Sequence, residues 1–411
     1  MNDKMKRLLT PEGVRDLLPG LARQKRELEG KIQEIFGRWG YREVATPAFE
    51  YSANFVAEMK ADLEDKVYRF PDERGRTLVL RPDFTLPLAR VAATHLAGGP
   101  KPLRLCYGGS IYRYASSQQG KQREQTQAGV ELIGIAGAGA DAEVMALAAD
   151  VLQELGLQEF TLCLGHAGFL ETLLNAHGVE AEDRENIIVY FNKKDFVSLK
   201  EMVGSLDISQ EAKDAILRVP HLRGGKEVLE AAAALVPAGE AAGPLAVLEE
   251  AWDVLEDYGV TRFITLDLGL VRMMDYYTGI VFEGYTGGLG YPICGGGRYD
   301  QLLENFGPQL PAVGFALNID HLLTKLQRLK KLAPQNRPVF VGYGEDGRAA
   351  ALLAAQRLRQ AGDEVLVDMA PRSAEEAKEL GLELGAAQLI YHSADNTETF
   401  RLADEGRNAG C

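Results

Sequence analysis

The sequence predicts an α+β protein with a helical insertion and a small α/β domain near its C-terminus. Residues 20–39 place apolar side chains at helical spacing with charges between them, and segments with strand character recur from there to about residue 291. Between about residues 168 and 258 the sequence changes to Ala-, Leu- and Glu-rich helical periodicity with few strand signals. Beyond residues 332–334, short apolar strands and helical stretches alternate, which is typical of a separate α/β domain.

The individual elements follow from hydrophobic periodicity along the chain. We expect a first domain over residues 1–330, which begins with the amphipathic helix at 20–39 and an extended segment at 42–51. It continues with a helix at 85–96 and with strands at 77–80, 102–112, 127–135, 160–164, 263–268, 279–285 and near Tyr291. The second domain, over residues 335–405, is expected to contain helices at 348–360 and 374–384 and strands at 339–343, 364–368 and 388–391.

The composition is that of an ordinary globular protein and argues against nucleic acid as a partner. Of the 411 residues, 46% are hydrophobic and 25% are charged, and this length is sufficient for two or three domains. The formal net charge is −14, whereas nucleic-acid binding needs clusters of Lys and Arg. Because the sequence has no run of about twenty apolar residues and no secretory signal, we expect a cytoplasmic protein without a membrane segment.

Cysteines and histidines do not indicate a metal site or a disulfide framework. The cysteines lie far apart without paired spacing, at Cys106, Cys163, Cys294 and Cys411. His321 stands alone on an expected helix, and we interpret it as a packed or solvated side chain. The other histidines are scattered in the same way. We therefore expect no metal and no cofactor.

Three separated groups of motifs combine arginines, carboxylates and glycines. The first is Leu-Arg-Pro-Asp-Phe-Thr at residues 80–85, the second consists of residues 110–113 and 127–131, and the third of residues 270–279, 294–300 and 311–316. In this order they resemble the motifs of class II aminoacyl-tRNA synthetases. The Asp-Tyr-Tyr and Gly-Gly-Gly-Arg-Tyr-Asp parts of the third group resemble the histidine-specific motifs of histidyl-tRNA synthetase. The resemblance covers nearly the whole chain, including a C-terminal domain similar to an anticodon-binding module. It implies an antiparallel sheet flanked by helices and a dimer built around the segment near Pro47.

The same motifs contain the groups that a free histidine molecule needs in a pocket. Its ammonium needs acceptors, its carboxylate needs a cation, and its imidazole needs polar partners. Gln127 and Glu131 are four residues apart, so on a strand they project from the same face. Asp83, Gln127 and Glu131 can bind the ammonium, Arg113 or Arg272 the carboxylate, and Tyr276 or Tyr277 the imidazole. We predict a histidine-binding site that consists of Asp83, Thr85, Arg113, Gln127, Glu131, Arg272, Tyr276 and Tyr277.

Structural roles are open for several of these positions. Asp83 could cap the helix that follows it, a task that Thr85 could share. Glu131 could pair with an arginine at the surface. Arg272 could be a structural salt-bridge partner, and Tyr276 and Tyr277 could be sheet residues. The glycines at 295–297 could form a turn.

The groups that would activate ATP in this family are replaced. Class II synthetases form an aminoacyl-adenylate, for which arginines and carboxylate-bound Mg²⁺ hold the phosphates. The resemblance places Ala115, Ser116 and Gln125 where the second motif has a Glu, an Arg and an adenine-stacking ring. The third motif, which ends in a phosphate-binding arginine in the family, leads here into His321, and an imidazole cannot replace a guanidinium. Residues 331–411 contain nine Lys/Arg and thirteen Asp/Glu, a net charge of −4 that suits an anticodon stem poorly.

A chain that keeps the histidine-binding residues but lacks the residues that activate ATP resembles the regulatory subunits of short-form ATP phosphoribosyltransferase. Arg-Pro-Asp-x-Thr at 81–85, where histidyl-tRNA synthetases usually have Arg-Pro-Glu-Gly-Thr, agrees with that resemblance. It implies a non-enzymatic subunit, a homodimer within a hetero-oligomer with the catalytic chain, with free histidine as effector and without tRNA. An active, divergent histidine-tRNA ligase that uses Arg113, Arg272 and residues 295–298 is the main alternative. A third is an amino-acid-binding or tRNA-mimicking regulator of another pathway.

Overall fold

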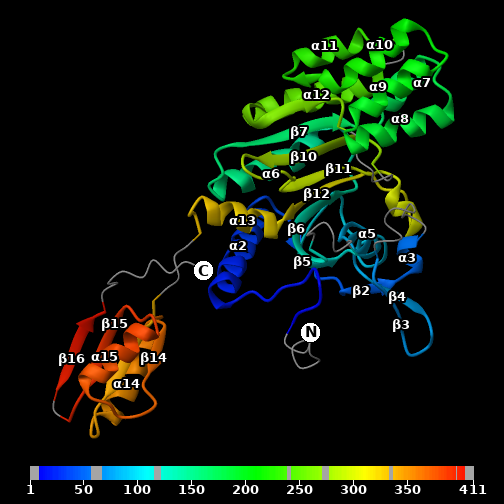
Figure 1. Cartoon of the computed structure of the whole chain (residues 1–411). Helices are drawn as coiled ribbons and strands as arrows, with labels where there is room; N and C mark the ends of the chain where they lie inside the picture. The colour runs from blue at the N-terminus through cyan, green and yellow to red at the C-terminus, as the bar shows by residue number, and fades with distance from the viewer. Residues whose placement is uncertain are drawn as a thin grey trace. The chain divides into compact units, whose positions relative to one another are not determined.

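The computed structural model of the chain describes residues 9–56, 67–114, 122–237, 242–270, 277–332, 337–394 and 396–402. The chain divides into two compact units, Met1–Leu332 and Ala333–Cys411. Each unit has its own sheet and its own hydrophobic core, as Figure 1 shows.

The large unit is built on a mostly antiparallel sheet. Within the described residues this sheet has nine strands, in the order β1 (Arg42–Glu43), β5 (Leu103–Tyr112), β6 (Glu124–Ile133), β12 (Ala312–Asn318), β11 (Cys294–Arg298), β10 (Ile280–Thr286), β7 (Phe160–His166), β9 (Ile264–Asp267) and β8 (Arg223–Gly224). The pairs β1–β5 and β7–β9 are parallel, and the other neighbours are antiparallel. The expected α+β class, with an antiparallel sheet flanked by helices, is confirmed.

Helices cover one face of this sheet and form the main core with it. They are α2 (Pro19–Arg38), α6 (Ala138–Glu154), α12 (Ala242–Asp257) and α13 (Ile319–Arg328). Helix α6 is apolar on nearly all sides, as a helix enclosed between other elements must be, and its Val144, Leu147 and Val151 are fully buried. Residues of β6 and β12 that point to this side, such as Val130 and Phe315, belong to the same core.

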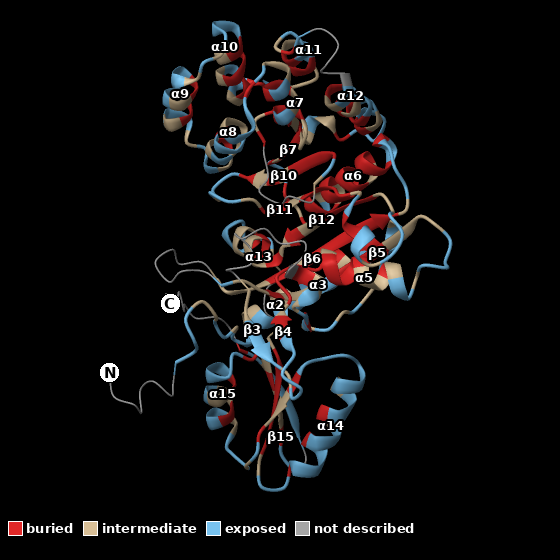
Figure 2. Cartoon of the chain, turned by 90° about the vertical axis from the view of Figure 1, so that its right-hand side faces the viewer, coloured by how far each residue is buried: buried red, intermediate tan, exposed pale blue. Residues whose placement is uncertain are grey.

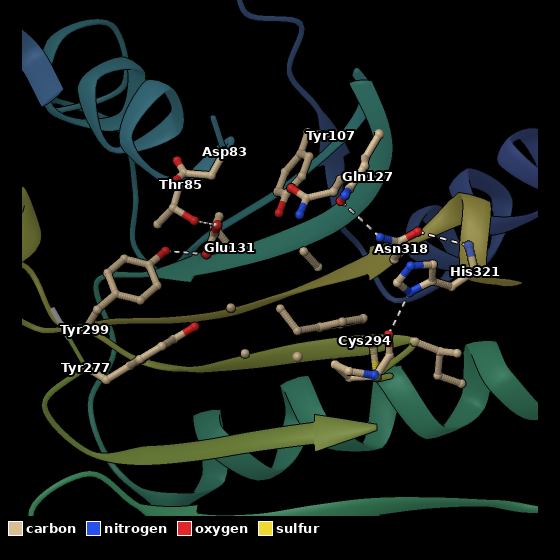
Figure 3. Close-up of a pocket in the computed structure, with 18 of the residues that line it drawn as sticks. Asp83, Thr85, Tyr107, Gln127, Glu131, Tyr277, Cys294, Tyr299, Asn318 and His321 are labelled. Carbon is tan, nitrogen blue, oxygen red and sulfur yellow. Dashed lines mark hydrogen bonds between the residues drawn. The ribbon is translucent and has the colours of Figure 1, made fainter. Parts of the chain in front are cut away.

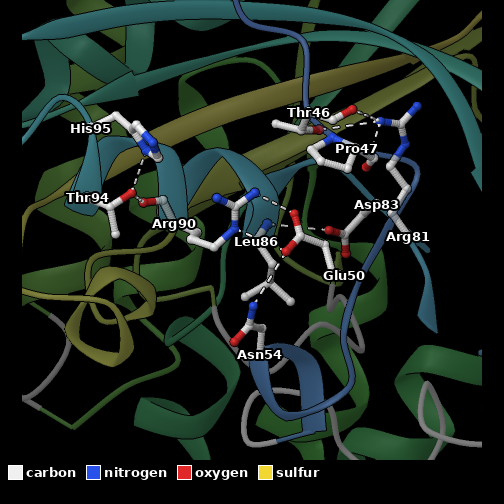
Figure 4. A network of polar contacts seen from close by, with 10 residues as sticks. All are labelled: Thr46, Pro47, Glu50, Asn54, Arg81, Asp83, Leu86, Arg90, Thr94 and His95. Carbon is white, nitrogen blue, oxygen red and sulfur yellow. Dashed lines mark hydrogen bonds and ion pairs between the residues drawn. The ribbon is translucent and has the colours of Figure 1, made fainter. Parts of the chain in front are cut away.

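A second, smaller core lies on the opposite face, between β5, β6 and α5 (Thr85–Thr94). Beside it lies a three-stranded sheet in the order β2 (Phe49–Tyr51), β4 (Thr77–Leu80) and β3 (Arg69–Pro71), with the short α3 (Ala53–Val56) after β2. Arg81 fixes the turn between β4 and α5, because its Nε donates to Ser110 O at 2.8 Å. Its Nη1 donates to Thr46 O at 2.8 Å, a contact that Figure 4 shows. Its guanidinium also lies 4.0 Å from the centre of the Phe84 ring. This turn presents Asp83 to the sheet.

The helical insertion follows β7, as Figure 1 shows at the top of the large unit. It contains α7 (Phe169–Ala176), α8 (Ala181–Lys193), α9 (Phe196–Ser205), α10 (Gln210–Arg218), α11 (Glu227–Ala233) and α12. Each helix buries a narrow apolar stripe and exposes its charged side, which Figure 2 shows as alternating red and blue turns. The two-residue strand β8 lies within this stretch and pairs with β9.

The small unit is an α/β domain with one strand more than the sequence predicted. Its sheet runs β14 (Val365–Val367), β13 (Val339–Tyr343), β15 (Gln388–His392) and β16 (Thr397–Arg401), with α14 (Arg348–Gln360) and α15 (Ala374–Glu383) as crossovers. The strands β14, β13 and β15 are parallel, and β16 is antiparallel to β15. We missed β16 because Thr-Glu-Thr-Phe-Arg is mostly exposed and lacks an apolar alternation.

The largest differences between expected and observed strand starts in the large unit concern β6 and β11. Strand β6 begins at Glu124, three residues earlier than the expected 127, because its first three residues, which are polar, pair with the end of β5. The strand expected near Tyr291 is instead β11, Cys294–Arg298. Glycines are poor strand formers in isolation, so the sequence pattern did not indicate that residues 295–297 are paired on both sides.

Candidate ligand-binding pocket

A cavity of about 180 Å³ lies over the middle of the large sheet, on the same face as α5. Figure 3 shows side chains that converge on it from the turn before α5, from β5, β6, β11 and β12, and from the start of α13. Its lining consists of Asp83, Thr85, Tyr107, Arg113, Gln125, Gln127, Glu131, Tyr277, Pro292, Ile293, Cys294, Gly295, Gly296, Tyr299, Gly314, Phe315, Ala316, Asn318 and His321.

Small residues form the floor of the cavity. Gly314 of β12 pairs with Glu131 of β6 on one side and with Gly297 of β11 on the other. A Cβ atom at Gly314 would collide with the Glu131 carboxylate, and one at Gly297 would lie 2.8 Å from the Tyr277 ring. Glycine is therefore required at both positions, and the Gly-Gly-Gly segment is a strand that admits side chains and ligand from above rather than a turn.

Glu131 is the most enclosed charged residue of the cavity, with 2% of its surface exposed. Thr85 Oγ1 donates a hydrogen bond to its Oε1 at 3.0 Å, and the Tyr299 hydroxyl donates to its Oε2. Burial, with a smaller contribution from the nearby Asp83 carboxylate, raises the pKa of Glu131 to about 8, although the hydrogen bonds from Tyr299 and Thr85 act to lower it. The alternative that Glu131 pairs with an arginine at the surface is wrong.

Asp83 lies above the sheet and is also buried, with 5% of its surface exposed. Its burial raises its pKa, an effect that the Arg113 guanidinium opposes. Asp83 Oδ1 accepts a long hydrogen bond of 3.5 Å from the Leu86 N–H, in the first turn of α5. Phe84, and not Asp83, occupies the position that caps α5. Asp83 thus supports the start of the helix while its carboxylate lines the cavity.

The structure brings together the predicted site residues that it describes. Arg113 is fixed by the hydrogen bond from its Nε to Pro82 O at 2.8 Å. Gln127 and Glu131 project from the same face of β6, as their spacing predicted, and Tyr277 packs over Gly297. Two predicted residues, Arg272 and Tyr276, lie outside the described residues, as do Ala115 and Ser116. Lining positions are held by Asp83, Thr85, Arg113, Gln127, Glu131 and Tyr277.

The opposite end of the cavity is formed by neutral groups (Figure 3). Asn318 Nδ2 donates to Gln125 Oε1 at 3.3 Å, and Asn318 Oδ1 accepts the His321 N–H at 3.0 Å, which caps α13. The His321 ring packs against Tyr291 with 4.0 Å between centres, and its Nδ1 lies 2.8 Å from Pro292 O. Burial lowers the pKa of His321, so its imidazole is neutral at pH 7. His321 is half-buried and packed, as interpreted, and it also lines the cavity.

Among the lining side chains that sequence reasoning missed are Tyr107, Tyr299 and Asn318. Tyr107 stacks on Phe84 with 4.4 Å between ring centres, and burial raises its pKa well above the usual value. It pairs with Gly129 on β6, so its place in the cavity follows from strand register and not from a motif. Tyr299 and Asn318 were within or next to quoted motifs, but their roles depend on the pairing of β11 and β12.

Arg298 belongs to the Gly-Gly-Gly-Arg-Tyr-Asp motif but is not one of the residues that line the cavity. Its Nε and Nη2 bind Asp141 of α6 at 2.8 and 2.7 Å, and its Nη1 lies 3.1 Å from Asp300. Both Arg298 and Asp141 are buried. This arginine joins β11 to α6.

The fold and this pocket define a protein of the class II aminoacyl-tRNA synthetase type. The family model of histidyl-tRNA synthetase matches residues 13–322. The ATP phosphoribosyltransferase regulatory subunit of Desulforamulus reducens is 42% identical over 382 residues, which cover 92% of this chain and 94% of the relative. The chain therefore belongs to the histidyl-tRNA synthetase-like family of ATP phosphoribosyltransferase regulatory subunits.

Solved structures give the same fold. A protein from Bacillus halodurans, described as an ATP phosphoribosyltransferase regulatory subunit/histidyl-tRNA synthetase, superposes with a TM-score of 0.84 at 34% identity, covering 94% of this chain and 98% of that one. The histidyl-tRNA synthetase of a Nostoc species has a TM-score of 0.81 at 21% identity, with coverage of 96% and 94%, a likeness in fold alone. Among the described helices of this chain, none is both long enough and apolar enough to span a membrane.

Proposed function

We propose that this chain is a non-enzymatic regulatory subunit, which joins a separate catalytic chain of ATP phosphoribosyltransferase in the first step of histidine biosynthesis. In this proposal, free histidine binds in the cavity and its binding conveys feedback inhibition to the catalytic chain. The family supports the role of the subunit, since the relatives that match most of the chain are regulatory subunits of that enzyme. The cavity supports histidine as the effector.

The observation that carries the proposal is the contrast between the two ends of the cavity. One end gathers Asp83, Glu131 and Arg113, which offer two carboxylates and a guanidinium to an amino acid. The other end presents Asn318 and the neutral imidazole of His321. Neutral amides and a neutral ring give no charge to hold the phosphates of ATP. The cavity suits a zwitterion better than a nucleotide.

Histidine can be placed with each of its groups near a complementary side chain. Its ammonium would lie between the carboxylates of Asp83 and Glu131, within reach of Gln127. Its carboxylate would approach Arg113, whose Nε is already occupied by Pro82 O and whose other nitrogens belong to the same rigid fork. Its imidazole would lie along the Tyr277 ring, which covers the glycine floor. Arg272 and Tyr276 are proposed to complete this site, and no cofactor is required.

The assembly proposed is a homodimer within a hetero-oligomer with the short-form catalytic chain, without tRNA. The net charge of −14 supports a protein partner over nucleic acid. Strand β2 leaves Phe49 and Tyr51 exposed, by 52% and 42%, beside the Pro47 segment proposed as the dimer contact. Exposed aromatic side chains on a sheet are typical of a surface that a protein covers.

Co-expression with a short-form catalytic chain tests the proposal. Size-exclusion chromatography should give one mixed species, whose phosphoribosyl transfer is inhibited by free histidine. Asp83→Asn should leave the mixed species and its activity intact but demand at least tenfold more histidine for half-inhibition, because coupling between two sites is reciprocal. Separate elution of the chains at micromolar concentration contradicts the assignment of the partner. Unchanged inhibition in the variant moves the histidine site elsewhere.

A further inference from the structure

The first residues of β6 extend beyond the strand that pairs with its other edge. Strand β5 pairs with β6 along its whole length, whereas β12 begins to pair at Gln127, three residues after the start of β6. Backbone N–H groups in a sheet need a partner, and here the partners come from outside the strands. Thr126 N–H donates to Asp320 Oδ2 at 2.8 Å. Arg123 N–H donates to Gly13 O at 2.6 Å.

This end of β5 and β6, which we term the rim, lines one side of the cavity. Arg113 N–H donates to Arg123 O at 2.9 Å, and the Arg113 side chain lines the cavity. Gln125 and Gln127, on either side of Thr126, line it as well. A shift of the rim therefore moves side chains that the proposed function assigns to the ligand. The rim consists of residues 112–113 and 123–127.

The Gly13 contact belongs to a short segment before α2, residues 10–16, which we term the strap. The strap has a second contact, in which Arg15 Nη2 lies 3.4 Å from Asp320 Oδ1. The same Asp320 carboxylate binds β6 through its other oxygen. The strap is thus joined to the rim directly at Gly13 and indirectly at Arg15.

The direct contact requires glycine at position 13. Gly13 has a φ of +79°, in the left-handed region, and an added Cβ would lie 2.5 Å from Arg123 Cγ. The Arg123 guanidinium in turn lies 4.9 Å from the centre of the Tyr114 ring. The backbone of the strap therefore approaches the start of β6 as closely as a chain without a side chain allows.

The strap is held by few contacts. Each of its residues is exposed or half-buried. The side chains of Arg15 and Asp320 are 43% and 14% exposed, so water weakens their ion pair. A segment with little buried surface opens locally at a low free energy, without unfolding of the sheet that it covers. Docking of the strap is therefore an equilibrium that a ligand can shift.

We propose that docking of the strap and binding of a ligand in the cavity are coupled, so that each strengthens the other. With the strap docked, the rim is ordered before the ligand arrives. With the strap detached, Arg123 N–H has lost its partner, and part of the binding free energy is used to order the rim. Arg123 acts here as a positioning residue for Arg113. The choice of histidine as the ligand rests on the proposed function, whereas the contact between strap and rim does not.

Hydrogen exchange of the full chain without ligand tests the contact between strap and rim. Gly13→Ala should detach the strap, so the amides of residues 123–127 should exchange about fivefold faster or more. Gly178, in the helical insertion, is a matched control, with a φ of +70° and nothing within 4 Å of an added Cβ. Gly178→Ala introduces the same kind of backbone strain and should leave exchange at the rim unchanged. Equal exchange in the two variants overturns the proposal.

Calorimetry and proteolysis with L-histidine test the coupling. Gly13→Ala should weaken histidine binding by about fivefold or more, and Gly178→Ala should not change it. Because coupling is reciprocal, L-histidine should slow trypsin cleavage after Arg15 in the unmodified chain by about the same factor. Cleavage after Arg348, at the start of α14 in the small unit, should keep its rate.

Arg15→Ala and Arg15→Lys provide a second pair of variants without backbone strain. Loss of the charge should weaken histidine binding by about twofold to fivefold, and lysine should restore most of it. If the unmodified chain and Gly13→Ala bind L-histidine equally tightly, the coupling is overturned and the proposed function stands. If L-histidine does not bind the unmodified chain, the proposed effector is wrong and the coupling to it falls, while exchange at the rim still decides whether the strap holds it.

Discussion

The carboxylate of Glu131 on β6 occupies the space that a side chain at Gly314 on β12 would need. The two residues are direct partners across the strands, so the glycine holds the acid over the sheet and keeps the cavity open. Gly314→Ala should displace Glu131, lower histidine affinity at least tenfold and reduce the free energy of unfolding by about 1–3 kcal/mol, as overpacking usually does. Calorimetry and urea unfolding measure the two effects.

A matched control for this glycine is Gly37 in α2, where an added Cβ meets nothing within 4 Å. Gly37→Ala should leave histidine affinity unchanged and raise the free energy of unfolding by up to about 1 kcal/mol, because alanine favours a helix. Equal affinity in the two variants would show that Gly314 does not position Glu131.

Glu131 should make the stability of the large unit depend on pH. Its pKa is about 8 in the folded chain and near the ordinary value of 4.5 when unfolded, so the folded state binds more protons between these values. The stabilisation is complete below about pH 4.5 and is lost as the pH rises to 8, by on the order of 5 kcal/mol. Urea unfolding of the unmodified chain and Glu131→Gln across this range should show the difference, and parallel curves would contradict it.

The chain should not catalyse histidine-dependent exchange between ATP and pyrophosphate. The neutral His321 and the amides of Gln125 and Asn318 offer no charge to the phosphates. His321→Arg alone should not restore exchange, because transition-state stabilisation fails when several contacts are missing together. Radiolabelled pyrophosphate incorporated into ATP above a control without protein would favour an active ligase.

The buried ion pair between Arg298 and Asp141 should stabilise the fold and not the ligand. Asp141→Ala removes the buried partner of Arg298, leaves its guanidinium with the more exposed Asp300, and should lower the free energy of unfolding by about 3–5 kcal/mol. Glu375→Ala removes the exposed ion pair with Lys378 in the small unit and should change it by less than about 1 kcal/mol. Similar losses in the two variants would mean that burial does not decide the strength of these pairs.

The periodicity of the sequence was sufficient to predict most helices and to predict which residues share one face of a strand. The spacing of Gln127 and Glu131 predicted their common orientation because it depends on one strand alone. The polar start of β6 and the polar strand β16 were missed, since their pairing is set by neighbours distant in sequence. The local sequence pattern does not indicate which distant strand a segment pairs with.

The same limit explains what sequence reasoning missed in the cavity. Tyr107 enters the cavity from β5, where it pairs with Gly129 of β6, and Tyr299 bonds to Glu131 from a segment 168 residues away. The motif that contains Arg298 suggested a ligand contact, but the direction of that side chain depends on Asp141 in α6. The predicted site residues that the structure describes do line one cavity.

The turn at Pro82 is held from both sides, by Arg81 toward Thr46 and Ser110 and by Arg113 toward the Pro82 carbonyl. Arg81 thus anchors the residue before Pro82, and Arg113 binds the Pro82 carbonyl, so we expect the neighbouring Asp83 to have little freedom to follow a ligand by itself. Because Arg81 binds Thr46, a displacement of the segment around Thr46 should also shift the turn and move the Asp83 carboxylate within the cavity. These hydrogen bonds connect the segment around Thr46 with the turn that carries Asp83, so we expect a partner bound at that segment to change the position of Asp83 in the cavity.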